Sequence, residues 1–81
     1  MPIIANELHH HIKTELAIID GLISDSPHEA LPRVMSLVED VRQTQDDQGY
    51  VTALLKMAEV YWHAMDYQAG LRVCRRIESL L

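Results

Sequence analysis

The sequence predicts an all-α protein of four helices, arranged as two stacked antiparallel hairpins. Apolar residues recur at helical spacing along most of the 81 residues, and short polar segments interrupt them near residues 24–27, 43–49 and 65–66. Gly and Pro number only three each, and no segment has the alternation or composition of a strand. We therefore expect one helical domain over residues 1–81, with a first hairpin at about 6–44 and a second at about 47–81.

Composition indicates a globular chain from a reducing compartment. Hydrophobic residues make up 48% and charged residues 23% of the chain, and the single cysteine, Cys74, excludes an internal disulfide. Residues 1–5 lack the basic region of an export signal, and no apolar run approaches the roughly 20 residues that a membrane-spanning helix needs. We expect a cytoplasmic protein that does not insert into a membrane.

The charge pattern argues against a nucleic-acid partner. The formal net charge is −5, and the basic residues are scattered apart from Arg72, Arg75 and Arg76. A protein that binds nucleic acid needs a continuous basic surface to displace phosphate counterions. We expect protein partners instead, and no cofactor.

The first helix should begin after Asn6, a competent N-cap that is followed by Glu7 in the first turn. It should end near the segment 24–27, where polar residues and a proline replace the apolar pattern. Its buried stripe is predicted to consist of Leu8, Ile12, Leu16, Ile19 and Ile23.

The second helix has a strong predicted start. Ser26 is a cap, Pro27 occupies the first helical position, and Glu29 stands three residues after the cap. Pro32 removes one amide donor inside the helix, so we expect a distorted first turn. The predicted buried face consists of Ala30, Leu31, Val34, Leu37, Val38 and Val41.

The third and fourth helices should form the second hairpin. The polar segment 43–49 contains Asp46 and Asp47, which can cap a third helix at about 50–65, and Asp66 can cap a fourth. Because Ala58 and Gly70 lack bulk, the two helices can approach closely. The predicted packing residues are Leu54, Met57, Ala58, Tyr61 and Met65 on the third helix, and Tyr67, Gly70, Leu71, Cys74 and Ile77 on the fourth. A buried Cys74 would be chemically inert.

Residues 51–81 resemble the tetratricopeptide repeat family. The first helix of that family's repeat carries a large residue, a Leu-Gly or Leu-Ala pair and an aromatic, and these positions are matched by Leu54, Met57–Ala58 and Tyr61. The turn of the repeat is matched by Met65–Asp66–Tyr67. The small residue of its second helix is matched by Gly70. Ile77 departs from the last small position of the family. The second and fourth helices align at a spacing of forty residues, against the family's usual thirty-four, and Gly21 replaces an aromatic in the first hairpin.

This resemblance implies a non-catalytic protein-interaction or dimerisation module, regulatory in a bacterial signalling protein and placed before an output domain such as a diguanylate cyclase. Each repeat hides its apolar face only against a neighbour, so two hairpins leave one face open. We expect a homodimer, or a chain that is the N-terminal part of a longer protein.

Aromatic residues and arginine dominate the energetics of protein interfaces. The residues predicted to contact a partner are Trp62, Tyr50, Arg72, Arg75 and Arg76. For Trp62 an alternative stays open, in which the ring covers the first hairpin.

The adjacent histidines His9, His10 and His11 point in directions about 100° apart on a helix, so they cannot bind one metal ion together. Glu7, His11 and Glu15 share a face, but without a fourth ligand they do not satisfy the coordination that zinc requires. We expect no metal site.

Residues 7–24 also resemble the phosphoacceptor helix of a subgroup of bacterial sensor histidine kinases and the helical hairpin of sporulation phosphotransferases. This second resemblance implies an alternative function, histidine phosphotransfer or kinase-like dimerisation, with His10 as the phosphoacceptor and Lys13 as the nearby cation. His11 and Thr14 stand where the kinase subgroup has arginine and asparagine. The sequence contains no glycine-rich phosphate loop and no nucleophile turn, so we expect no enzyme.

Overall fold

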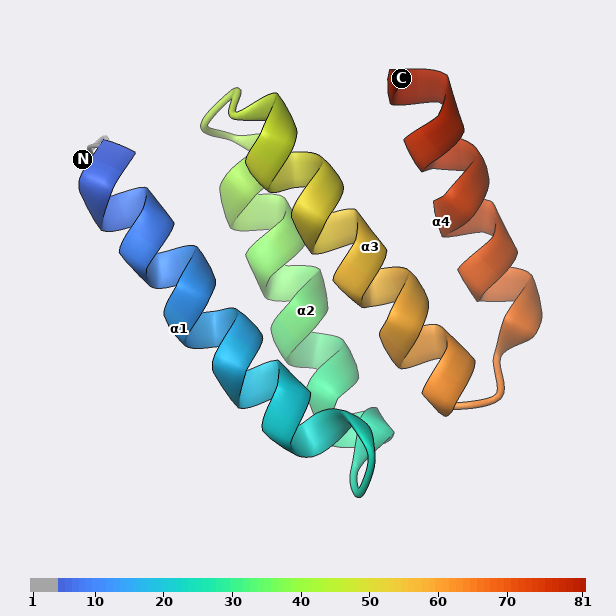
Figure 1. Ribbon diagram of the computed structural model, residues 1–81. Helices are drawn as coiled ribbons and strands as arrows, with labels where there is room; N and C mark the ends of the chain where they lie inside the picture. The colour runs from blue at the N-terminus through green and yellow to red at the C-terminus, as the bar shows by residue number, and fades with distance from the viewer. Residues whose placement is uncertain (1–4) are drawn as a thin grey trace.

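The computed structural model describes residues 5–81, with their side chains apart from those of residues 5, 6 and 8. It confirms an all-α fold of four helices, α1 (Ala5–Ile23), α2 (Pro27–Arg42), α3 (Asp47–His63) and α4 (Tyr67–Leu80), and residues 5–81 contain no strand. Successive helices run antiparallel and are joined by short turns (Figure 1). Helices α1 and α2 thus form one hairpin, and α3 and α4 form the other.

Helix α3 is the centre of the stack. It packs against α2 on one side and α4 on the other, and it also contacts α1, whereas α4 contacts only α3 among the described helices. In Figure 1, α2 lies behind the space between α1 and α3, while α4 stands at the edge of the stack. One side of the second hairpin therefore has no neighbouring helix.

Two apolar clusters hold the helices together. The larger one joins α1, α2 and α3, and the smaller one joins α3 to α4 through Leu54, Val73 and Ile77. The stripes predicted for the first two helices are confirmed where the structure describes them, while the side chain of Leu8 lies outside the described part. The buried members of the larger cluster are Ile12, Ile19, Ile23, Ala30, Val34, Leu37, Val41, Ala53 and Val60.

The predicted aspartate caps of α3 and α4 are confirmed by hydrogen bonds, although α3 begins at Asp47 and not at about residue 50. A carboxylate oxygen of Asp46 accepts a bond from the Gly49 backbone N–H at 3.1 Å, and Asp66 accepts one from Ala69 at 3.2 Å. Each bond satisfies one amide that the first turn of a helix leaves without an intrahelical partner.

The starts of the first two helices differ from the expectation. Helix α1 begins at Ala5, so Asn6 lies inside the helix, and its side chain is outside the described part. Pro27 occupies the first turn of α2 as predicted, but the side chain of Ser26 makes no capping bond. The Ser26 carbonyl instead accepts bonds from the amides of Glu29 and Ala30. Helix α2 continues unbroken through Pro32.

Helix α3 buries two faces where one stripe was predicted. Leu54 is buried against α4 as expected, and Ala53 and Val60 are buried against the first hairpin. Met57, Ala58 and Tyr61 are half-buried. The prediction of a buried Met65 is wrong, because this residue is 76% exposed and lies in the turn after α3 at a φ of 63°.

Helix α4 is rotated relative to the prediction. Gly70 and Ile77 are buried as expected, and Ala69 and Val73 are buried with them. Tyr67 is 47% exposed, Leu71 is 54% exposed and Cys74 is exposed, so the inward placement of these three residues is wrong. Val73 and Cys74 both stand three or four residues from Gly70 and Ile77, and helical spacing alone does not distinguish them.

Candidate protein-binding surface

The second hairpin carries an uncovered apolar surface, which we call the open face. It combines one stripe from α3 with one from α4, both at spacings of three, four or seven residues that keep a side of a helix in line. On α3, Leu55 is 56% and Trp62 is 62% exposed. The stripes consist of Val51, Leu55, Ala58 and Trp62 on α3 with Met65 in the turn that follows, and of Tyr67, Leu71 and Cys74 on α4 with Leu81 after its end. The exposed Glu78 stands between Cys74 and Leu81.

An aromatic pair joins the two stripes at the turn between α3 and α4. The ring centroids of Trp62 and Tyr67 are 4.7 Å apart, and the ring planes meet at 65° in an edge-to-face contact. Such pairs contribute about 0.5–1.5 kcal/mol beyond the area they bury. Trp62 therefore lies on the second hairpin and does not cover the first, and its exposed part is available to a partner.

A hollow of about 410 Å³ lies at the opposite end of the open face, between the start of α3 and the end of α4. Its walls are formed by Asp47, Gln48, Val51, Thr52, Leu80 and Leu81. The open face therefore runs the length of the hairpin, from an aromatic ridge to a hollow.

Gly70 lies where α4 packs closely against α3. A Cβ placed on Gly70 would stand 3.7 Å from the Ala58 carbonyl oxygen and 3.7 Å from the Tyr61 Cβ. The predicted close approach at Ala58 and Gly70 is thus confirmed.

The three arginines of α4 do not act as one row. Arg76 donates a hydrogen bond from Nε to the Tyr50 hydroxyl at 2.9 Å, and its Cζ stands 6.0 Å from the centre of the Tyr50 ring. Tyr50 is half-buried and packs against both apolar clusters. Tyr50 and Arg76 therefore help to hold α3 to α4, and their predicted contact with a partner stays a prediction.

Arg72 and Arg75 are exposed beside the open face. Together with Gln68 and Leu71 they line a shallow hollow of about 360 Å³. Because Leu71 belongs to the apolar stripe, this hollow gives the α4 side of the open face a basic edge. These two arginines remain predicted contact residues.

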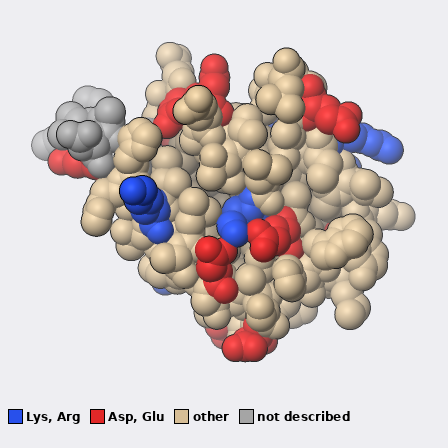
Figure 2. Space-filling model, in the orientation of Figure 1, with Lys and Arg blue, Asp and Glu red and all other residues tan. Residues whose placement is uncertain are grey.

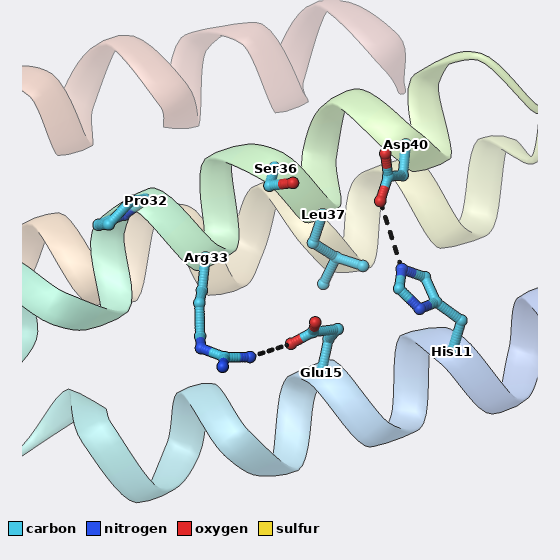
Figure 3. A pocket seen from close by; sticks show the side chains of 7 residues that line it. All are labelled: His11, Glu15, Pro32, Arg33, Ser36, Leu37 and Asp40. Carbon is cyan, nitrogen blue, oxygen red and sulfur yellow. Dashed lines mark hydrogen bonds and ion pairs between the residues drawn. The ribbon is translucent and has the colours of Figure 1, made fainter.

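The first hairpin presents a different, polar surface. Arg33 donates a hydrogen bond from Nη1 to Glu15 Oε2 at 2.9 Å, and His11 Nε2 lies 3.3 Å from Asp40 Oδ2, so two pairs join α1 to α2 (Figure 3). They border a hollow of about 280 Å³ that Leu37 also lines. Covering this surface would remove charged groups from water, which costs free energy.

Another polar contact joins the first hairpin to the second. Lys56 Nζ on α3 donates to Asp20 Oδ1 on α1 at 2.6 Å and to Glu59 Oε2 at 2.8 Å. Figure 2 shows neighbouring acidic and basic groups at the centre of a face that is otherwise mostly uncharged. Partial burial lowers the pKa of Lys56, but the bonds to Asp20 and Glu59 outweigh it and raise that pKa above its ordinary value of 10.5.

His10, the alternative phosphoacceptor, is exposed on α1. It lines a hollow of about 440 Å³ with Glu7, His11 and Thr14. The carboxylate of Glu7 would repel a phosphoryl group on His10, since added phosphate charge is stabilised by cations. Among the residues whose side chains the structure describes, no group of three potential metal ligands occurs.

Several members of the open face were missed by sequence reasoning. Leu55 was not singled out, while Met65, Tyr67, Leu71 and Cys74 were assigned to the core. The sequence signal that could have identified them was a second stripe of apolar residues, which runs beside the buried stripe on each helix. Of the residues predicted to contact a partner, Trp62 lies on the open face, and Arg72 and Arg75 lie beside it.

None of the helices within residues 5–81 combines the length and apolarity needed to cross a lipid bilayer. The expectation about an export signal concerns residues 1–5, of which residues 1–4 lie outside the described part. Comparisons of the chain with protein-family models, with curated proteins and with solved structures find no match.

Proposed function

We propose that this chain is a non-catalytic protein-interaction module of the tetratricopeptide-repeat type, and that its open face receives a helix from a protein partner. The observation that carries the proposal is the exposure of large apolar side chains in two parallel stripes on α3 and α4. Contiguous exposed apolar surface of this kind is a mark of interaction sites.

The shape of the open face favours a helical partner. Two antiparallel helices pack closely at Gly70, and an amphipathic helix can lay its apolar side along such a pair. Each large apolar side chain that becomes fully buried contributes about 1.5–3 kcal/mol. Leu55, Trp62 and Leu71 are the expected anchors, because they combine size with exposure above one half.

The resemblance to tetratricopeptide repeats supports a regulatory role in a bacterial signalling protein. In that setting, occupation of the open face would control the assembly of an attached activity, such as a diguanylate cyclase domain, in the cytoplasm. The module itself would bind and position, without a catalytic step.

The proposal can be tested by site-specific photo-crosslinking in the cells that produce the chain. A photoreactive amino acid replaces Leu55 or Leu71 on the open face, or Ser36 at an exposed position of α2 as the matched control. We expect light-dependent adducts from positions 55 and 71 and none from position 36. Equal labelling at all three positions, or no adduct at either open-face position, would contradict the proposal.

A further inference from the structure

We propose that the partner on the open face is a second copy of this chain, related by a two-fold axis parallel to the hairpin. In this arrangement α3 of each copy lies on α4 of the other and the four helices form a bundle. The inference rests on the proposed function, because it names the occupant of the same surface.

The first argument is that the apolar stripes match each other. Rotation about an axis parallel to the helices preserves the direction of each helix, so α3 of one copy runs antiparallel to α4 of the other. The α3 stripe follows steps of three and four residues, the pattern that allows side chains of paired helices to interdigitate. The α4 stripe follows them from Tyr67 to Cys74, and the exposed Glu78 occupies the next step before Leu81. A two-fold interface of this kind is closed, since each copy covers the same surface on the other.

The second argument is charge complementarity at the two edges. Glu59 lies one turn beyond Leu55 on the outer side of the α3 stripe, and it is exposed although it bonds to Lys56. Arg75 lies one turn beyond Leu71 on the outer side of the α4 stripe. The two-fold axis brings each acidic edge beside a basic edge, once on each side of the bundle.

The positions of these charges along the hairpin are compatible. Glu59 precedes the end of α3 at His63 by four residues, and Arg75 follows the start of α4 at Tyr67 by eight. At 1.5 Å per residue these offsets are about 6 Å and about 12 Å from the same turn. Glutamate and arginine side chains can bridge the difference.

A head-to-tail stack, in which the open face covers the first hairpin of the next copy, is disfavoured. That surface carries the Arg33–Glu15 and His11–Asp40 pairs, which would have to leave water without new partners.

The test is sedimentation equilibrium of the purified chain from low micromolar to several hundred micromolar concentration. We expect a monomer–dimer equilibrium that Leu71→Glu abolishes. Glu59→Arg and Arg75→Glu should each weaken dimerisation about tenfold, or about 1.4 kcal/mol, and the double variant should recover most of the loss. Glu29→Arg, at an exposed position of α2, is the matched charge control and should leave the equilibrium unchanged.

Because Glu59→Arg also removes a bond to Lys56, thermal unfolding of each variant at low concentration checks that the monomer is folded. Cys74, the only cysteine, gives a second readout. Its rate of maleimide labelling should fall as concentration rises in the wild-type chain and stay constant in Leu71→Glu.

The outcomes separate this inference from the proposed function. The chain could stay monomeric in sedimentation while the photo-crosslinked adducts have a mass other than twice 9.3 kDa. This pair of results would overturn the proposal that the partner is a second copy and would support a different protein partner. A dimer that tolerates Leu71→Glu uses another surface and overturns the inference. Charge reversals that fail to compensate each other overturn the two-fold arrangement.

Discussion

Arg76 and Tyr50 connect the end of α4 to the start of α3, with 2.9 Å between the Arg76 Nε and the Tyr50 hydroxyl oxygen. The two residues are 26 positions apart in the sequence. The guanidinium also lies over the tyrosine ring, at 6.0 Å from its centre. This contact fixes the open end of the hairpin. The contact between Trp62 and Tyr67 lies at the opposite end, beside the turn.

Replacing Tyr50 by phenylalanine should remove the hydrogen bond and keep the ring under the guanidinium. We expect the free energy of unfolding to fall by about 0.5–1 kcal/mol, the usual net contribution of such a bond. Arg76→Met should lose the cation–π contact as well, and so destabilise the chain further. Urea unfolding followed by the fluorescence of the single tryptophan, Trp62, measures both changes.

Arg72→Met is the control for these variants, since Arg72 is exposed on the same helix. It should change stability by less than about 0.5 kcal/mol, as surface substitutions usually do. A double variant of Tyr50 and Arg76 that shows full additivity would contradict a direct interaction between them.

Gly70→Ala should stabilise the chain by about 0.5–1 kcal/mol, because alanine favours a helix over glycine and the new Cβ would lie at ordinary contact distance, 3.7 Å, from α3. Gly70→Leu should instead cost about 1–3 kcal/mol, since the larger side chain has to displace Ala58 or Tyr61. Thermal or urea unfolding distinguishes the two signs.

Gly21 provides the matched position, because a Cβ there would meet nothing within 4 Å. Gly21→Ala and Gly21→Leu should both be tolerated. If leucine is accepted equally well at positions 21 and 70, the close packing of α3 against α4 is not present in solution.

Lys56 should make stability fall at alkaline pH. Its pKa is raised in the folded state, so its charged form stabilises the fold fully below the unfolded pKa of 10.5 and loses this effect as pH rises through the folded pKa. Lys56→Met retains an apolar side chain and removes the titrating group. The difference in urea midpoint between wild type and Lys56→Met should therefore shrink as pH increases through this range.

Taking the difference between the two proteins removes the contribution of groups that both contain, including the tyrosines. Lys13→Met, at an exposed position of α1, is the matched control for the loss of a lysine charge. A difference for Lys56→Met that does not change with pH would mean that the bonds to Asp20 and Glu59 add no stability.

Trp62, Arg72 and Arg75 show how far the candidate site could be predicted. Aromatic and arginine residues are recognisable as interface types in any sequence, so these three were proposed as contact residues, and all three are exposed. Tyr50 and Arg76 belong to the same types, but they contact each other. Leu55, Leu71 and Cys74 were not assigned to the surface, because apolar residues at helical spacing are equally compatible with a core.

The sequence by itself determined the four helices and most of their ends, because caps such as Asp46 and Asp66 and the stripes of α1 and α2 act within a few residues of the chain. Tertiary structure decided which side of α4 is buried and that α3 buries two sides. Val73 and Cys74 satisfy the same helical period. Only the position of a neighbouring helix determines which of these two side chains is buried.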